Sequence, residues 1–525
     1  MSLARQAKAA AVYARGLPAV DARTMLHALL LLGICSLPLL LYLPFLHEPF
    51  LRDEGFYAAV AQRTLEGDIP YRDAFDNKPP LIFAWYALSF LLFGENVWAP
   101  RLLVALLLCG TTALVYVQGR LLFGRSAAYV AAGAFALSMG IAELQTNANT
   151  EYFLLLPMTG ALVAFTMGRR TGSAGWYALS GFLGGLAIMT KQVAAFNFLL
   201  LAGLPLLWTV QEKGRAQLTV ARTWLSALAQ GAGCFAAVAL VCAPFVATGT
   251  FGDLVDGAVF YAAGYSENLS YGTRLLALLR GAVFLAFVAG PWLALTALGV
   301  TQLAQRESGE RRHLLPAWMA ASALGIFVTG RFYDHYFVQL LPGMALLAAP
   351  AAAFLFDRGR RLTTRTAAWA WLAPLVLLAL AFSAHIYLQP TPEARHETKF
   401  AGNGVGVWEN DSEALGDWLA ARTDEDDYIY NLGFQSELYF YADRRSPTRH
   451  LFDHPFAVDR KYEEEAIRDL EAHPPAYIVD TAVYEPDTVA ANYYSQPIKD
   501  WIAAHYDRFG KLYYADIYRL KESYR

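Results

Sequence analysis

The chain is poor in charged residues. Asp, Glu, Lys and Arg make up 17% of its 525 residues, whereas about 25% is typical of soluble proteins. The deficit falls before residue 390, where apolar runs of about 20 residues alternate with short basic loops. The mean hydropathy is +0.31. The composition therefore predicts a polytopic α-helical membrane protein with a soluble tail.

Cysteine is also scarce, and no cysteine pair has the spacing of a metal or redox motif. The four cysteines lie in apolar segments, where buried free thiols are expected: Cys35, Cys109, Cys234 and Cys242. The net charge of −3 does not indicate a nucleic-acid partner. No internal repeat is evident, so the inverted repeats of many transporters are not indicated.

The N-terminus lacks the small-residue cleavage site of a secretory signal. Residues 1–23 carry Arg5, Lys8, Arg15 and Arg23, and we expect a cytoplasmic leader to the first membrane helix.

About eleven membrane crossings are expected within residues 24–388. The candidate spans are 24–46, 100–118, 127–143, 152–168, 176–191, 193–210, 224–247, 276–300, 314–330, 335–356 and 366–388. A further apolar run, 81–93, has only about 13 residues and is short for a span. If it lies at the interface, all the basic loops fall on one side, as the positive-inside rule requires. Residues 47–99 then form one long periplasmic loop.

The tail, residues 389–525, has a different pattern. Strand-like runs at 427–433 and 476–484 alternate with helix-like runs at 411–423 and 460–473. This alternation predicts a small soluble α/β domain, which the topology places on the same side as the long loop.

Unusual polar groups gather in the loops of that side. Ionisable groups at membrane depth are costly and are functional candidates by default. The candidates are Asp53, Glu54, Lys78, Glu151, Lys191, Arg331, His335 and Tyr336. Carboxylates and cations on one face suit group transfer from a phosphate leaving group. A carboxylate takes the proton of an attacking hydroxyl, and cations stabilise the departing phosphate.

Each candidate also has a structural interpretation. Asp53 and Glu54 could mark only the point where the helix reaches water. Lys191 could reach lipid headgroups as an anchor. His335 and Tyr336 could belong to an interfacial aromatic belt.

The order of the motifs resembles that of a known family. After the first span come Asp53-Glu54, "YRDAFDNKPPLIFAW", "LFGENVWAPRL", "GRLLFGR", "TNANTEYFLLLP", "GLAIMTKQ" and "DHYFVQLLPGMALL". Over about residues 24–350 the chain is similar to the GT-C superfamily of membrane glycosyltransferases. The nearer groups are the aminoarabinose and other lipopolysaccharide sugar transferases and the protein O-mannosyltransferases. The tail resembles, more weakly, their periplasmic α/β domain.

The resemblance implies a polyprenyl-phosphate sugar donor and transfer on the outer face of the membrane, without a metal or with a weakly linked divalent cation. Asp53 matches the catalytic base, and Glu54 is the neighbouring acid of the same motif. Lys78 matches a lysine that binds donor phosphate. Glu151 matches the acidic residue of the second outer loop, and Lys191 a lysine at the same helix end.

Arg331, His335 and Tyr336 are expected to contact donor phosphate or headgroups. One departure concerns Asn77, because the aminoarabinose transferases have glutamate before the lysine. Asn77 weakens the inference of a metal and argues against that substrate. The sugar and the acceptor, which could be a glycan, a lipid or a protein, remain open.

The resulting hypothesis is an inverting glycosyltransferase of a bacterial inner membrane, with its site and C-terminal domain in the periplasm. One alternative is a transporter or flippase for lipid-linked sugars. Another is a non-enzymatic envelope assembly protein. The loop 246–275 is either a mobile lid or a plain connection.

Overall fold

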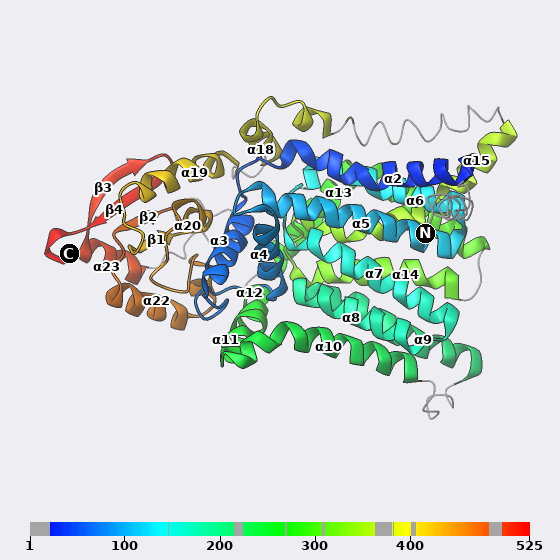
Figure 1. Cartoon of the computed structure of the whole chain (residues 1–525), viewed down its shortest axis with the longest axis horizontal. Helices are drawn as coiled ribbons and strands as arrows, with labels where there is room; N and C mark the ends of the chain where they lie inside the picture. The colour runs from blue at the N-terminus through cyan, green and yellow to red at the C-terminus, as the bar shows by residue number, and fades with distance from the viewer. Residues whose placement is uncertain are drawn as a thin grey trace, which may run out of the picture.

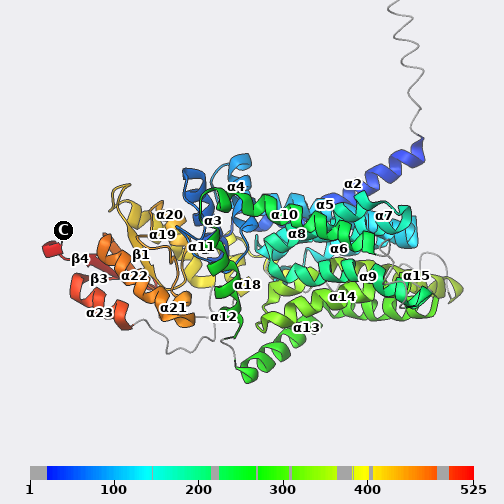
Figure 2. The same cartoon turned by 90° about the horizontal axis from the view of Figure 1, so that it is seen from below.

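The computed structural model describes residues 21–144, 146–214, 224–267, 270–306, 310–362, 381, 383–400, 406–481 and 496–524. Long helices lie side by side in a bundle, and a smaller domain with a β-sheet adjoins one end of it (Figures 1 and 2). The short helices α3 and α4 lie at that end, between the long helices and the sheet domain.

Fourteen labelled helices make up the described bundle and its ends. They are α2 (Ala22–Tyr42), α3 (Arg52–Glu66), α4 (Leu81–Phe93), α5 (Trp98–Phe123), α6 (Arg125–Ser138), α7 (Thr150–Thr171), α8 (Ala174–Thr190), α9 (Ala195–Lys213), α10 (Leu225–Ala247), α11 (Phe251–Val255), α12 (Ala262–Glu267), α13 (Tyr271–Arg306), α14 (Glu310–Thr329) and α15 (Leu341–Leu362). A 3-10 helix, Asp334–Leu340, precedes α15.

Within the described residues, seven helical segments are long and apolar enough to cross a membrane. They are Ala22–Phe45, Trp98–Phe123, Thr150–Thr171, Gln192–Lys213, Leu225–Ala247, Tyr271–Gln305 and Asp334–Leu355. The polytopic helical architecture expected from the composition is thereby confirmed. The expected total of about eleven crossings stays a prediction, and the span 366–388 lies largely outside the described residues.

Shorter helices occupy other expected positions. Helix α4 has the bounds of the run that we assigned to the interface, and α8 and α6 match two expected spans but have 17 and 14 residues. Helix α14 also forms where a span was expected. The leader is described only from residue 21, where the Asp21 side chain caps α2 by accepting from Thr24 N, 2.7 Å.

Where the structure describes the C-terminal part, it contains a four-stranded sheet and six α-helices. The strands are β1 (Ile429–Leu432), β2 (Tyr477–Asp480), β3 (Tyr506–Leu512) and β4 (Ala515–Leu520); the helices are α18 (Pro392–Phe400), α19 (Gly406–Ala420), α20 (Glu437–Ala442), α21 (His454–Val458), α22 (Arg460–Ala472) and α23 (Gln496–His505). The strand order is β1-β2-β4-β3. The β1–β2 pair is parallel, with Ile429 opposite Tyr477, and the β2–β4 and β3–β4 pairs are antiparallel.

This sheet confirms the small α/β domain. The expected strands 427–433 and 476–484 contain β1 and β2, and the expected helices match α19 and α22. The hairpin of β3 and β4 was not anticipated. Strand β4 of this hairpin pairs with β2, so β2 has a neighbouring strand on both edges, and its first three side chains are buried.

The sheet domain and the bundle share apolar contacts. Phe75 of the first loop lies 4.8 Å from the ring of Tyr462 in α22 and 5.2 Å from Tyr261, and all three belong to one cluster of buried side chains. Such aromatic contacts bury large apolar areas. The domain is therefore packed against the end of the bundle where the candidate residues lie.

Candidate active site

Asp53 and Glu54 lie in the first turn of α3, yet their surroundings differ. Asp53 is exposed, whereas Glu54 is fully buried. The Glu54 carboxylate accepts hydrogen bonds from the backbone N–H groups of Leu51, 3.0 Å, and Ala148, 2.7 Å. Glu54 thus joins the start of α3 to the second loop and leaves Asp53 as the accessible carboxylate of the pair.

The partner of Glu54 is Arg101, a residue that the sequence analysis did not single out. Arg101 is 1% exposed. Its Nε and Nη2 donate to Glu54 Oε1 and Oε2 at 3.0 and 2.5 Å. The same guanidinium donates to backbone carbonyls of the segment before α3, including Pro49 O at 2.7 Å and Glu48 O. The sequence did carry a signal for Arg101, because it is an arginine in the first turn of an apolar helix, within the quoted stretch "LFGENVWAPRL".

A second ion pair lies beside the first. Glu151, in the first turn of α7, pairs with Lys191, which follows α8. His335 Nε2 lies 3.8 Å from Glu151 Oε1. The Lys191 ammonium lies 3.8 Å from the centre of the Tyr336 ring, in a cation–π arrangement. Four of the candidate residues from three separate segments therefore form one cluster.

The first loop carries Lys78 toward this cluster. The Lys78 Nζ donates to Asn77 Oδ1 at 2.8 Å. The backbone carbonyl of Lys78 accepts from the Tyr71 hydroxyl at 2.6 Å. Electrostatic interactions link Lys78 and Asp53 to both Lys191 and His335. The structure thus brings Asp53, Lys78 and the Glu151–Lys191 pair within interaction range.

Asp76 is a second residue that the sequence analysis did not propose for the site. It is 4% exposed, and its Oδ1 accepts from the Asn77 N–H at 2.7 Å. Among the described residues its Oδ2 has no hydrogen-bond partner. The pKa of Asp76 is raised to about 6, because burial and the nearby Asp53 raise it by more than Lys78 and the Asn77 N–H lower it. A buried carboxylate near Asp53 and Lys78 can exchange a proton close to neutral pH.

Arg331 reaches the cluster through an aromatic side chain. It is 6% exposed, and its Nη1 lies 3.4 Å from the Tyr333 hydroxyl. The Tyr333 ring stacks on His335 with ring centres 5.9 Å apart. Arg331 follows Gly330, which has a φ of +68°, in a tight turn between α14 and the 3-10 helix. This turn sets Arg331 at the edge of the cluster.

The segment that we considered as a lid or a connection is mainly helical. It contains α11, a π-helix at Asp256–Tyr261 and α12, and its residues 268 and 269 lie outside the described part. Gln192 Nε2 donates to Asn77 O at 2.7 Å and to Ala258 O at 3.2 Å. π-Helices are rare and often occur at functional sites. The segment lies directly against the loop that carries Lys78.

In the part of the chain that the structure describes, no group of three or more His, Cys, Asp or Glu side chains has the arrangement of a metal site. The four cysteines are free thiols.

The comparisons relate this fold to known proteins. Residues 77–241 match the model of the family described as dolichyl-phosphate-mannose-protein mannosyltransferase. The fold is that of the GT-C membrane glycosyltransferases, and the resemblance expected from the order of the motifs is confirmed.

Two solved structures show this fold. ArnT from Cupriavidus metallidurans, bound to undecaprenyl phosphate, has a TM-score of 0.59 at 16% identity, with 96% of this chain and 99% of that chain covered. The archaeal oligosaccharyltransferase AglB from Archaeoglobus fulgidus, in complex with an inhibitory peptide and a dolichol-phosphate, has a TM-score of 0.53 at 15% identity, with 95% and 75% covered.

Two curated relatives match over shorter stretches. An uncharacterized protein of Aquifex aeolicus is 32% identical over 162 residues, which are 30% of this chain and 36% of that protein. YkcB of Bacillus subtilis, described as a candidate mannosyltransferase, is 28% identical over 124 residues, which are 23% of this chain and 17% of that protein. The matches thus span about a third or less of the curated relatives.

Proposed function

We propose that the protein is an inverting glycosyltransferase that moves a sugar from a polyprenyl-phosphate donor to a hydroxyl acceptor. The observation that carries this proposal is the meeting of Asp53, Lys78 and the Glu151–Lys191 pair at one end of a GT-C fold. Membrane-embedded charges are costly, so their convergence from separate loops favours a reaction site. The neighbours that bind undecaprenyl phosphate or dolichol-phosphate support the class of donor.

In the proposed reaction, the acceptor hydroxyl attacks the anomeric carbon of the sugar. Asp53 takes the hydroxyl proton, the new glycosidic bond forms, and the bond from the anomeric carbon to the phosphate oxygen breaks. The polyprenyl phosphate leaves as an anion, so no general acid is needed. A single displacement inverts the anomeric configuration.

The cations have distinct places in this scheme. Lys78 and Lys191 lie where they can stabilise the departing phosphate, and such preorganised charge is commonly the largest contribution to catalysis. Arg331, His335 and Tyr336 form the edge of the donor site.

The two remaining acids support the site in different ways. The Glu54 carboxylate is occupied by Arg101 and by two backbone N–H groups, which favours a positioning role over the catalytic role expected from the motif. Glu151 is occupied by Lys191 and keeps that ammonium directed at the site.

We place the protein in a bacterial inner membrane, with the site and the C-terminal domain in the periplasm. The basic loops on the opposite side support this orientation. Residues 1–23 would then be the cytoplasmic leader, 24–388 the transmembrane domain and 389–525 the periplasmic domain.

The test is mass spectrometry of the cell envelope of a deletion strain complemented with wild type, Asp53→Asn or Glu66→Gln. Glu66 lies at the other end of α3, in exposed ion pairs with Arg63 and Arg445. We expect one sugar to vanish from an acceptor in the deletion strain while its lipid carrier accumulates. Wild type and Glu66→Gln should restore it, and Asp53→Asn should not.

Other outcomes separate the alternatives. Unchanged carriers and acceptors in the deletion strain would refute the transferase. Accumulation of the lipid-linked sugar on the cytoplasmic side alone would favour a flippase. Full complementation by Asp53→Asn would refute the assignment of the base.

A further inference from the structure

The segment Leu46–Leu51, which we call the strap, connects the first membrane helix to α3 and to Asp53. Arg101 holds the strap from the side of the bundle. From the other side, the Phe50 N–H donates to the Tyr441 hydroxyl of α20 at 3.0 Å. The Phe50 ring lies 5.2 Å from the Phe440 ring. The strap is therefore held between a membrane helix and the C-terminal domain.

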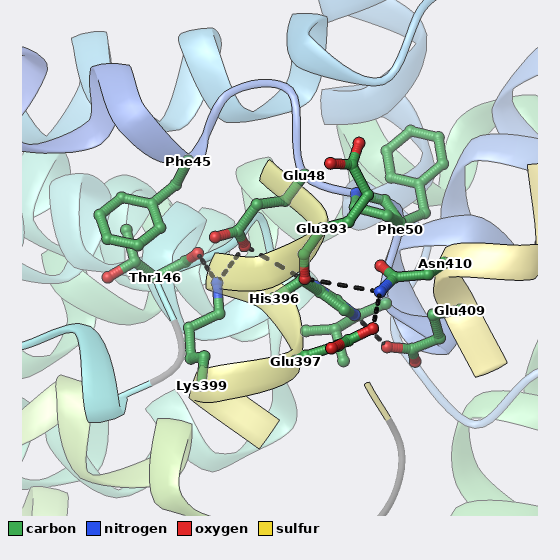
Figure 3. A network of polar contacts seen from close by, with 12 residues as sticks. Phe45, Glu48, Phe50, Thr146, Glu393, His396, Glu397, Lys399, Glu409 and Asn410 are labelled. Carbon is green, nitrogen blue, oxygen red and sulfur yellow. Dashed lines mark hydrogen bonds and ion pairs between the residues drawn. The ribbon is translucent and has the colours of Figure 1, made fainter. Parts of the chain in front are cut away.

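A buried charge network reinforces this contact (Figure 3). Glu48 in the strap is fully buried and pairs with the Lys399 ammonium of α18. The same ammonium donates to Thr146 O in the second loop at 3.0 Å. His396, one turn earlier in α18, has its Nδ1 3.7 Å from Glu48 Oε2. One carboxylate of the strap thus has two cationic partners from the C-terminal part.

The network continues to the first residue of α3. His396 Nε2 lies 2.5 Å from Glu409 Oε2 in α19 (Figure 3). The other oxygen of Glu409 accepts from the Arg52 N–H at 3.1 Å. Arg52 is the neighbour of Asp53 in the sequence. A carboxylate that accepts a helix N-terminal N–H stabilises the start of the helix, so Glu409 contributes directly to the backbone position of Asp53.

The C-terminal domain also touches α3 two residues after Asp53. A Cβ added at Gly55 would lie 2.2 Å from Glu437 Cβ and 2.6 Å from Glu437 Cα in α20. Helix α3 and helix α20 can approach this closely only because residue 55 has no side chain. Contacts on both sides of Asp53, at Arg52 and Gly55, therefore come from the C-terminal domain.

We propose that the C-terminal domain is a positioning element of the transferase site, which sets Asp53 against the donor cations through the Lys399–Glu48 and His396–Glu409 pairs. This inference rests on the proposed function. Catalytic groups must be held within a fraction of an ångström, and a displacement of about 1 Å can cost a factor of about 100 in rate. The domain contributes to the rate without supplying a group that touches the substrate.

The charge states of the network agree with this role. Burial alone would raise the pKa of Glu48, but the charges of Lys399 and His396 outweigh it and lower the pKa. Burial alone would lower the pKa of His396, but its hydrogen bond with Glu409 and the nearby Glu48 carboxylate raise the pKa above its usual 6.5. The contribution of protonated His396 is thus present below pH 6.5 and is lost as the pH rises through its raised pKa.

The other charges around His396 act in opposite directions. The Glu48 carboxylate of the strap and the Glu409 carboxylate of α19 favour its protonated form, whereas the Lys399 ammonium of α18, which pairs with Glu48, disfavours it. Glu437 lies beyond Glu409. Its pKa is raised to about 8, mainly by burial and next by the charge of Glu409. Deprotonation of His396 and Glu437 at alkaline pH would leave like charges beside the start of α3.

The experiment measures kcat and the donor KM of the full-length protein in lipid nanodiscs for wild type, His396→Gln and Glu409→Gln. We expect kcat to fall about 10-fold to 100-fold, with the donor KM unchanged because Lys78 and Lys191 are untouched. The alkaline limb of the kcat–pH profile should shrink in His396→Gln to the part that Glu437 contributes. The control is Arg508→Ala, which removes the exposed Arg508–Asp516 ion pair of the β3–β4 hairpin and should behave as wild type.

A milder variant covers the case in which the network variants do not fold. Tyr441→Phe removes only the hydroxyl that accepts from Phe50, and we expect kcat to fall several-fold with an unchanged unfolding temperature. Wild-type kcat and pH profile in a folded His396→Gln or Tyr441→Phe protein would overturn the positioning role while the transferase stands. A wild-type protein without transfer activity would refute the proposed function itself.

Discussion

The guanidinium of Arg101 and the carboxylate of Glu54 form a two-pronged ion pair, with Nε to Oε1 at 3.0 Å and Nη2 to Oε2 at 2.5 Å. Both side chains are fully or almost fully buried. The arginine guanidinium holds several N–H donors in a planar fork, so it can pair with Glu54 and also donate to backbone carbonyls of the strap. Neighbouring acids in the sequence therefore have separate environments, with Glu54 locked inside and Asp53 outside.

Removal of Arg101 should destabilise the protein strongly. Loss of one partner of a buried ion pair typically costs about 3–5 kcal/mol, because the other charge stays buried. We expect Arg101→Ala to lower the unfolding temperature markedly and Arg101→Lys to lie between it and wild type, since lysine lacks the fork. Thermal unfolding in detergent measures this. Arg120→Ala, at the exposed far end of α5, is the control, and an equal effect there would contradict the prediction.

The Glu151–Lys191 pair should show strong coupling. Lys191→Met leaves the buried Glu151 carboxylate uncompensated, whereas Lys191→Met with Glu151→Gln removes both charges. We expect the double variant to be more stable than Lys191→Met alone, although both are inactive in transfer. A double-mutant cycle on unfolding temperature measures the coupling. Additive effects of the two changes would show that the pair contributes nothing.

Glu437 should make stability depend on pH. Burial first, and the nearby Glu409 second, raise its pKa from 4.5 to about 8. Between these values the folded protein binds a proton that the unfolded chain does not bind, so stability falls as the pH rises through this window. We expect Glu437→Gln to match wild type near pH 4.5 and to become progressively more stable than wild type toward pH 8.

The measurement for Glu437 is the unfolding temperature across that pH range. Glu471→Gln replaces an exposed glutamate of α22 and should follow the wild-type curve. Parallel curves for wild type and Glu437→Gln would contradict the prediction.

Close packing of α8 on α10 should be sensitive to a single methyl group. A Cβ at Gly233 would lie 1.9 Å from Ala178 O, and a Cβ at Gly181 would lie 1.8 Å from Gln230 O. Small residues allow membrane helices to approach closely, so Gly233→Ala should separate these helices and lower the unfolding temperature.

Gly231 is the matched control for Gly233 because it lies in the same helix and a Cβ added there would have no neighbour within 4 Å. Gly231→Ala should be neutral or should stabilise by about 0.5–1 kcal/mol through helix propensity. Equal effects at the two positions would show that helix propensity, rather than packing, decides the outcome.

The sequence alone was sufficient for elements that depend on local pattern. The apolar runs predicted the membrane helices, and the bounds of α4 follow from a proline pair before it and Gly94 after it. Strand β1 and helix α22 follow from local alternation and from the amphipathic run after Asp459. Hydrophobic periodicity is a property of neighbouring residues, so it can be read before folding.

The tertiary structure alone decided which polar groups meet. Arg101 contacts Glu54, which is 47 residues away in the sequence, and Glu409 contacts Arg52, which is 357 residues away. The motif order marked Asp53 as the base and Glu54 as its neighbouring acid, but only the folded chain shows that Asp53 is exposed and Glu54 is buried. The contacts of the C-terminal domain with α3 were likewise hidden, because burial and pairing of charges depend on which distant segments fold together.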